Sequence, residues 1–183
     1  KKAISLGAKV IVCEVLPTQI SNDVTYILVK NSHAALAFMA ANFFENPSHN
    51  LELVGVTGTN GKTTTVSMIE QILQKSGKNA IACGNIGVPM IELEKRPCDI
   101  AVAEISSFQL ETLNSFCPHI AVILNVTEDH LNRHYTMENY VFLKRKLLKN
   151  LTETEYAVLN YDDPIVRAFA DGLKANIRWI SLR

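Results

Sequence analysis

One stretch, VGVTGTNGKTTT, beginning at Val54, constrains the fold of this chain more than any other. An apolar run ends in a glycine-rich turn, and the turn leads through Lys62 and Thr63 into a helical pattern. Glycines in such a turn let backbone N–H groups point at anionic oxygens, and the following helix presents its positive N-terminus to them. The stretch therefore predicts a strand, a phosphate-binding loop and a helix, with Lys62 at the outer phosphates of a nucleotide and the Thr63 hydroxyl on Mg²⁺.

The loop departs from the general phosphate-loop pattern at one position. That pattern has a glycine five residues before Gly61, and Val56 occupies the place. The loop is therefore of the shorter Gly-Thr-Asn-Gly-Lys-Thr variety. The residues predicted to bind the nucleotide here are Gly58, Thr59, Asn60, Gly61, Lys62, Thr63 and Thr64.

Composition is ordinary for a globular protein with a hydrophobic core, at 48% hydrophobic and 20% charged residues. Lysine plus arginine equals aspartate plus glutamate at 18 each, so neither nucleic acid nor a membrane surface is indicated as a partner. No apolar run approaches the roughly 20 residues of a membrane helix, so we expect no membrane insertion. The four scattered cysteines are typical of buried, reduced thiols in a cytoplasmic protein.

The chain reads as two domains, neither of them whole. Residues 1–48 are interpreted as the end of a small α/β N-terminal domain, with strands at 9–13 and 26–29 and a helix at 34–44. The break Asn46-Pro47-Ser48 places the boundary within residues 46–51. Residues 49–183 form the second domain, which we expect to be truncated. Both ends look cut, so a piece of a longer protein is expected.

From residue 51 onward, apolar strands alternate with helices. Continuous β-branched runs joined by helices predict an α/β fold in which a parallel sheet carries helices on both faces. The predicted strands are 51–56, 80–83, 99–103, 119–124, 156–159 and 178–183, the last with nothing after it to pair with. The predicted helices are 62–76, a short one after residue 87, 107–114, 137–150 and 164–173.

Polar residues follow several of these strands directly. Ligands of such sheets lie at the carboxyl ends of the strands, where the phosphate loop, Asn85, Glu104 and Asn125 all fall. A carboxylate ending an apolar strand is costly to bury unless it has a partner, and Mg²⁺ beside the phosphates would supply one for Glu104. A solvated strand end or a helix cap would also explain Glu104.

His130 and Lys144 are ambiguous from residue chemistry alone. Asp129-His130 is an ordinary dipeptide that capping by the aspartate would explain, and magnesium prefers oxygen ligands. Lys144 lies on an amphipathic helix, a position that predicts a solvent-exposed side chain. The remaining histidines have no partners at ligand spacing and receive no role; they are His33, His49, His119 and His134.

Four ordered motifs resemble the Mur ligases, the ATP-dependent enzymes that build the peptidoglycan stem peptide in the bacterial cytoplasm. They are GTNGKT at 58–63, GNIG at 84–87, AEISSFQLE at 103–111 and NVTEDHLNR at 125–133. The resemblance covers nearly the whole chain, and four motifs in order are far more specific than a phosphate loop alone. It implies the P-loop central domain of that family, which uses ATP and Mg²⁺.

Two parts of the chain resemble different branches of the family. GNIG and SSFQLE are similar to the branch that adds D-glutamate to UDP-N-acetylmuramoyl-L-alanine. NSHAALA at 31–37 and FFENPS at 43–48 are similar to the first domain of the branch that adds the third residue, a diamino acid. That branch would carry Ser-Ser-His at 106–108. A chimera, a fused gene or a divergent member could each give this combination, and we give more weight to the catalytic centre.

The resemblance also implies roles for individual residues. Lys62 and Thr63 would bind the outer phosphates and the first Mg²⁺, with Glu104 as its second protein ligand. His130 would help hold a second Mg²⁺, and Lys144 aligns with the lysine that these ligases carbamylate. A carbamate turns a cation into an oxygen ligand, which suits magnesium. Lys62, Glu104, His130 and Lys144 form the implied catalytic set.

Substrate contacts are implied for Asn85, Ser106 and Ser107, which would touch the UDP-N-acetylmuramoyl-peptide, while Asn125 would lie close to the phosphates. The amino acid to be added would bind a third domain that this chain lacks, so the fragment alone is expected to be inactive. A monomer is expected. Three alternatives stay open: the diamino-acid ligase, a folylpolyglutamate synthetase, which GNIG and Ser106-Ser107-Phe108 argue against, and a non-catalytic nucleotide-binding paralogue.

Overall fold

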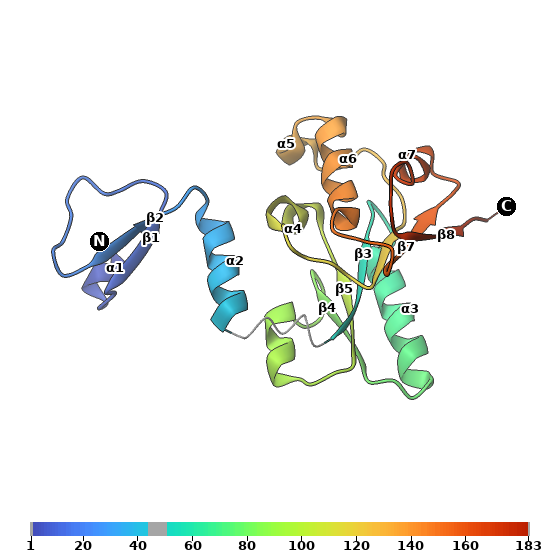
Figure 1. The fold of residues 1–183 in the computed structure, drawn as a ribbon, viewed down its shortest axis with the longest axis horizontal. Coiled ribbons are helices and arrows are strands. Elements are labelled where there is room, and N and C mark those ends of the chain that lie inside the picture. The colour runs from blue at the N-terminus through green and yellow to red at the C-terminus, as the bar shows by residue number, and fades with distance from the viewer. Residues whose placement is uncertain (1, 44–50, 183) are drawn as a thin grey trace. The chain divides into compact units, whose positions relative to one another are not determined.

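The computed structural model describes residues 2–43 and 51–182 (Figure 1). The chain divides into two compact units, Lys1–Asn46 and Pro47–Arg183. The break expected within residues 46–51 lies outside the described residues except for its last position. In the part of the chain that is described, no helix is long and apolar enough to cross a membrane.

The first unit consists of two helices and a two-stranded parallel sheet. Its elements are α1 (Lys2–Ser5), β1 (Val10–Cys13), β2 (Thr25–Leu28) and α2 (Ser32–Phe43). Val10 pairs with Thr25 and Cys13 with Leu28. The Asn31 side chain accepts from Ala34 N (2.9 Å) at the start of α2, as expected of a helix cap. The predicted strands and helix lie within two residues of these bounds.

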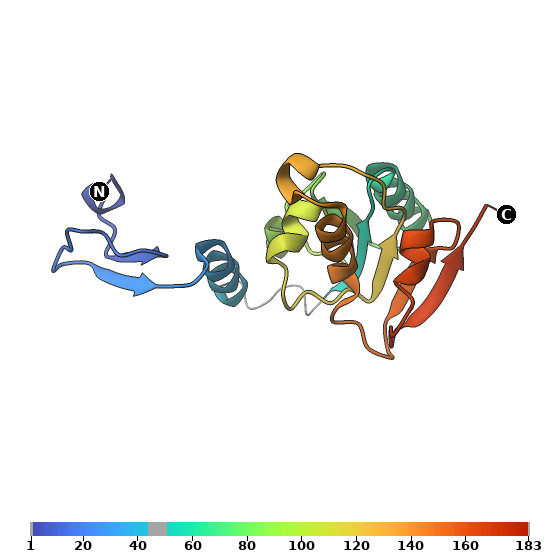
Figure 2. The same ribbon diagram turned by 90° about the horizontal axis from the view of Figure 1, so that it is seen from above.

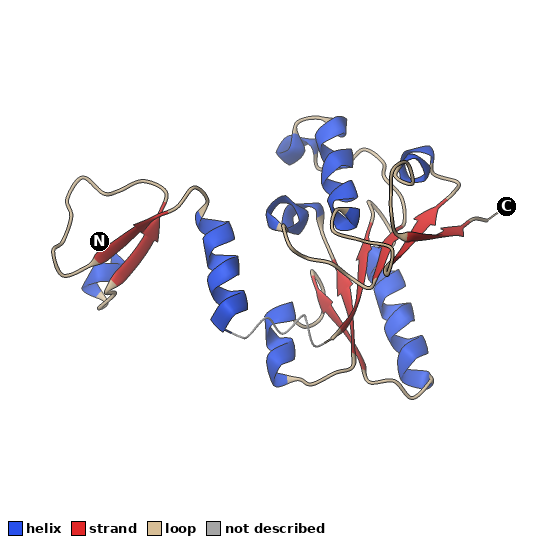
Figure 3. Ribbon diagram, in the orientation of Figure 1, coloured by secondary structure: helices blue, strands red, loops and turns tan. Residues whose placement is uncertain are grey.

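The second unit is built on a six-stranded sheet in which every neighbouring pair is parallel (Figure 3). The strand order is β4-β5-β3-β6-β7-β8. The strands are β3 (Glu52–Thr57), β4 (Ala80–Gly84), β5 (Ile100–Glu104), β6 (Ile120–Ile123), β7 (Tyr156–Asn160) and β8 (Asn176–Ile180). The predicted parallel α/β sheet is confirmed.

Helices cover both faces of this sheet (Figure 2). Because strand residues alternate between faces, the central strand serves two cores. Val54 and Val56 pack with Val66 of α3 in one core, and Leu53 belongs to the other, with Leu147 and Tyr140. The sheet is therefore buried between two layers, which explains its continuous apolar strands.

The helices of the second unit are shorter and more numerous than predicted. They are α3 (Lys62–Lys75), η2 (Met90–Lys95), α4 (Ser107–Thr112), α5 (Leu131–His134), α6 (Met137–Arg145), η3 (Lys146–Leu148) and α7 (Pro164–Ala168). The predicted helix 137–150 ends its α-helical part at Arg145. The predicted helix 164–173 ends at Ala168 and continues in i to i+3 turns up to Gly172, whose φ is 73°. The four-residue helix α5 was not predicted.

The C-terminal strand and the cysteines match the sequence prediction in part. The strand expected at 178–183 is β8, which begins two residues earlier and pairs with β7 along its length.

All four cysteines are free thiols; Cys83 and Cys98 are buried and the other two are half-buried. Burial raises the pKa of the Cys83 thiol to about 12, so it is unreactive.

The register of the sheet brings the strand ends together. Gly84 lies opposite Glu104, Glu104 opposite Val56, and Thr57 opposite Ile123. The chain leaves all four strands at one edge, so the phosphate loop, Asn85, the 105–107 segment and Asn125 meet there. This edge is the candidate site.

Candidate nucleotide site

The phosphate loop connects β3 to α3. At its end Gly61 has φ of 81°, in the left-handed region that favours glycine. No side chain caps α3, so the first-turn N–H groups of this 14-residue helix keep the donor capacity that an anion can use. The predicted loop geometry is present.

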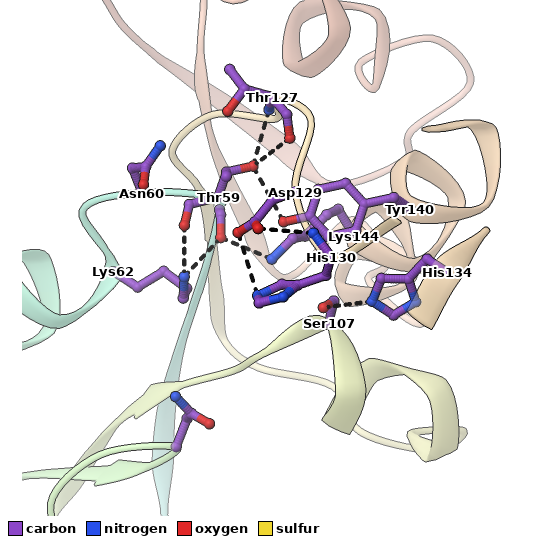
Figure 4. Close-up of polar contacts among 12 residues, drawn as sticks. Thr59, Asn60, Lys62, Ser107, Thr127, Asp129, His130, His134, Tyr140 and Lys144 are labelled. Atoms are coloured by element: carbon purple, nitrogen blue, oxygen red, sulfur yellow. Dashed lines mark hydrogen bonds and ion pairs between the residues drawn. The ribbon is translucent and has the colours of Figure 1, made fainter. Parts of the chain in front are cut away.

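Lys62 is half-buried and folds back onto its own loop (Figure 4). Its Nζ donates to the carbonyl oxygens of Gly58 (3.0 Å) and Thr59 (2.9 Å). These contacts hold the ammonium within the loop.

Asn125 fastens the other side of the loop. Its side-chain amide accepts from Asn60 N (2.8 Å) and donates to Asn60 O (3.1 Å). Its main-chain carbonyl oxygen accepts from Thr59 N (2.9 Å). An asparagine can satisfy a donor and an acceptor at once. Asn125 is thus a structural partner of the loop.

Glu104 is the buried carboxylate of the site, with 2% of its surface exposed. Thr63 Oγ1 donates to one of its oxygens (2.8 Å) and Asn85 Nδ2 to the other (2.8 Å). A carboxylate and a hydroxyl are ligands that Mg²⁺ prefers, usually alongside phosphate oxygens and water. Thr63 and Glu104, predicted as metal ligands from separate motifs, therefore lie together in a suitable arrangement.

Gly84 makes that arrangement possible. Its φ is 95°, and a Cβ at this position would lie 2.4 Å from the backbone oxygen of Glu104. The same oxygen accepts from Asn85 N (2.9 Å). Only a glycine lets β4 and β5 approach this closely while turning Asn85 toward the carboxylate.

Lys144 corrects the expectation of a solvent-exposed side chain. It is 1% exposed, and its Nζ donates to Gly58 O (2.8 Å) and Thr57 Oγ1 (3.2 Å). Burial, and next the positive charge of Lys62, lower the pKa of Lys144 to about 7. The helical pattern misplaced this residue because the face of α6 that carries it packs against the end of β3.

His130 lies at the turn after β6. Its backbone is left-handed (φ 53°), its Nε2 lies 3.3 Å from Asp129, and it is exposed. Asp129 also accepts from His130 N (2.8 Å), but His130 is itself the N-cap of α5 and no side chain caps that helix, so the capping explanation is wrong. Among the described residues, no three His, Cys, Asp or Glu side chains form a group that could hold a metal.

Ser106 and Ser107 begin α4, and both hydroxyls already have protein partners. Ser106 forms a capping box with Gln109. Ser107 Oγ lies 2.9 Å from Nε2 of His134, which is 1% exposed. Sequence reasoning gave His134 no role, because its partners Ser107 and Glu111 are distant along the chain.

A buried contact between the hydroxyls of Thr59 and Tyr140 also supports the phosphate loop. Thr59 Oγ1 lies 3.2 Å from the Tyr140 hydroxyl, donates to Thr127 O (3.1 Å) and accepts from Thr127 N (3.0 Å). Tyr140 is on α6, one turn before Lys144. α6 therefore holds the loop through two side chains, which sequence patterns did not reveal.

Comparison with known proteins agrees with this geometry. Residues 56–182 match the family model described as the Mur ligase middle domain. The UDP-N-acetylmuramoylalanine–D-glutamate ligase of Clostridioides difficile is 44% identical over 136 residues, which is 73% of this chain and 30% of that protein. The same enzyme of Caldicellulosiruptor bescii is 49% identical over 127 residues, 68% of this chain and 28% of that one. The chain spans about three-tenths of the length of these relatives.

Solved structures give the same fold. MurF ligase from Thermotoga maritima, in complex with ADP, superposes with a TM-score of 0.68 at 26% identity, covering 98% of this chain and 43% of that one. A UDP-N-acetylmuramoyl-L-alanyl-D-glutamate–2,6-diaminopimelate ligase gives a TM-score of 0.75 over 98% of this chain and 42% of its own, at 24% identity. With its phosphate loop, buried Glu104 and matching central domain, this chain belongs to the Mur ligase family.

Proposed function

We propose that the protein containing this chain is an ATP-dependent amide-bond-forming ligase of peptidoglycan precursor synthesis, acting in the cytoplasm. The reaction adds D-glutamate to UDP-N-acetylmuramoyl-L-alanine. The contact between Thr63 and Glu104 is the main support for the proposal. It places a hydroxyl and a carboxylate, both suitable ligands of Mg²⁺, next to each other where the phosphate loop meets α3. The identity of 44–49% to D-glutamate ligases favours this amino acid.

The residues of the site would each have a separate role in phosphate binding and phosphoryl transfer. Lys62 would exchange its two loop carbonyls for the outer phosphates, and the first-turn N–H groups of α3 would add to the charge stabilisation. The substrate carboxylate would attack the γ-phosphate and displace ADP to give an acyl phosphate, and the uncharged amine of the amino acid would then displace inorganic phosphate and lose a proton to form the amide. Magnesium, held by Thr63 and Glu104, would offset charge on the transferring phosphoryl group.

Lys144 fits the role of a carbamylated lysine. Carbamate formation joins an uncharged amine to carbon dioxide with release of a proton, and a pKa near 7 makes the uncharged form abundant at neutral pH. A carbamate there would supply oxygen ligands for a second magnesium ion, to which His130 would also contribute after turning from Asp129. This assignment explains why a lysine is buried beside Lys62, where two cations repel each other.

Substitution of Lys62 in the full-length protein tests the proposal. We expect Lys62→Ala to lower ATP-dependent phosphate release by at least ~1,000-fold, with Lys78→Ala, on an exposed turn, as the matched control. Retained activity in Lys62→Ala would exclude the phosphate-loop role. ATP binding without turnover in the wild type would favour a non-catalytic paralogue.

Amino-acid specificity is tested separately with the wild-type enzyme. D-Glutamate should support amide formation with UDP-N-acetylmuramoyl-L-alanine. Turnover only with diaminopimelate or L-lysine, on the UDP-N-acetylmuramoyl-L-alanyl-D-glutamate substrate, would instead assign the diamino-acid branch. Turnover only with a folate and L-glutamate would assign the synthetase.

A further inference from the structure

His134, which lies outside the proposed catalytic set, is buried and makes two polar contacts with α4. Its Nε2 lies 2.9 Å from Ser107 Oγ, and its Nδ1 lies 3.5 Å from Glu111 Oε1. Ser107 and Glu111 are one turn apart on α4, so the imidazole spans that face of the helix. One buried ring therefore fixes the rotation of α4, whose start carries Ser106 and Phe108.

The neighbours of the ring define its hydrogen bonds. Glu111 is an acceptor held by Arg133 at 2.8 Å. Because a carboxylate can only accept, Nδ1 is the ring nitrogen placed to face Glu111 with its proton, and Nε2 lies within hydrogen-bond distance of the Ser107 hydroxyl.

The backbone around His134 is strained at both flanks. His130 has φ of 53° and Tyr135 has φ of 67°, in a region that non-glycine residues rarely adopt. The His134 carbonyl accepts from Thr136 N (2.8 Å), which closes a three-residue turn at Tyr135, and from Asn139 Nδ2 (3.0 Å). Such strain persists only where surrounding contacts hold it, and His134 supplies them through its side chain and its carbonyl.

Phe108 completes the link between this turn and α4. Its ring centroid lies 5.1 Å from that of His130 and 5.5 Å from that of His134. The His134 ring lies 5.4 Å from Tyr140, which supports the phosphate loop. A displaced His134 would therefore move Phe108 and His130 together.

We propose that His134 is a positioning residue that locks the 130–135 turn to α4 through Ser107, and so sets the affinity for the muramoyl-peptide substrate. The inference rests on the proposed function and on the muramoyl-peptide contacts that the family resemblance implies for Asn85, Ser106 and Ser107. The hydrogen bonds of the Lys62 and Thr63 side chains go to Gly58, Thr59 and Glu104, which lie outside the 130–135 turn and α4. Substrate affinity should thus depend on His134 more strongly than ATP affinity does.

Steady-state kinetics of the full-length enzyme test this separation. We expect His134→Phe, which keeps a ring but loses both polar contacts, to raise the KM for the muramoyl-peptide by about 10-fold or more. The KM for ATP should stay within about twofold. His134→Gln, whose amide can reach Ser107, should restore part of the affinity, and Ser107→Ala added to His134→Phe should cause little further loss.

A second histidine provides the structural control. His119 Nδ1 accepts from Leu53 N at the opposite edge of the sheet (3.0 Å), so His119→Phe loses a comparable bond away from the site. The same KM pattern in His119→Phe, or an equal rise in both KM values in His134→Phe, would overturn the inference. If His134→Phe fails to fold, His134→Gln alone must still raise the muramoyl-peptide KM selectively, and the absence of that rise also overturns the inference. A wild type that forms no amide bond would instead contradict the proposed function.

Discussion

The two lysines of the site lie on opposite sides of the same loop and differ in their surroundings. Lys62, with Thr63 and Asn85, forms a loop side whose polar groups are exposed or half-buried around one buried carboxylate. Lys144, with Tyr140, His134 and Ser107, forms a helix side whose members are all buried. Exposed groups can exchange protein partners for a ligand, whereas buried polar groups are costly to separate. We infer that the loop side binds the ligand and that the helix side keeps the phosphate loop in place.

Lys144 is the exception that tests this division, because the proposed carbamate would make a residue of the helix side a binding group as well. We expect Lys144→Ala to lower amide formation in the full-length enzyme by at least ~100-fold. Added acetate or propionate should restore part of the rate, since a short carboxylate can occupy the space and supply the missing oxygens. Rates measured with and without carboxylate check this, with Lys149→Ala, an exposed lysine, as the control. Wild-type activity in Lys144→Ala would exclude a ligand-binding role for Lys144 and leave the helix side with a structural role alone.

Gly84 is where the loop side depends on backbone geometry. Alanine at this position would have φ of 95° and a Cβ 2.4 Å from Glu104 O, so β4 would have to move away from β5. We expect Gly84→Ala to lower the free energy of unfolding by on the order of 3 kcal/mol. The single tryptophan, Trp179, lies on β8 of the same unit and reports its unfolding in urea.

Gly77→Ala provides the matched control for that measurement. Its φ of 82° is also unfavourable, but a Cβ there would meet no atom within 4 Å. The destabilisation should therefore be clearly smaller than that of Gly84→Ala. Equal effects would mean that backbone strain alone, without the approach to Glu104, explains Gly84.

Sequence patterns predicted the residues of the loop side but not those of the helix side. The sheet, the loop and the nearness of Thr63 to Glu104 follow from short motifs at strand ends, because a parallel sheet brings those ends to one edge. Lys144 and His134 gave no local signal: helical spacing alone cannot tell which face of α6 packs on β3, and the partners of His134 lie more than 20 residues away. The family resemblance identified Lys144 where spacing indicated solvent, and nothing identified His134.

The buried charge of Lys144 leads to a prediction for stability against pH. A lysine whose folded-state pKa is about 7, against 10.5 when unfolded, binds fewer protons folded than unfolded between those values. Its contribution to stability therefore rises with pH across that window and is lowest below pH 7. We expect Lys144→Met to stabilise this chain by about 2 kcal/mol at neutral pH, after allowing for two lost hydrogen bonds.

The pH dependence distinguishes this cause from better packing. The gain of Lys144→Met should shrink as the pH rises from about 7 to beyond the unfolded-state pKa of 10.5, above which the wild-type lysine is neutral in both states. Urea unfolding followed by Trp179 fluorescence at several pH values measures it, and Lys149→Met should show no such trend. A gain independent of pH would mean that methionine merely packs better and that Lys144 is not held neutral.

Tyr140→Phe probes the most modest contact of the helix side. The change removes the hydroxyl that lies 3.2 Å from Thr59 Oγ1, while the ring keeps its place in the core beside His134. Thr59 retains both hydrogen bonds to Thr127, so no buried polar atom is left without a partner. We expect a loss of about 1 kcal/mol in the free energy of unfolding. Tyr135→Phe, at a position 83% exposed, should be neutral in the same urea titration. If Tyr140→Phe were equally neutral, the Thr59 contact would contribute nothing to the hold of α6 on the loop, and Lys144 alone would supply it.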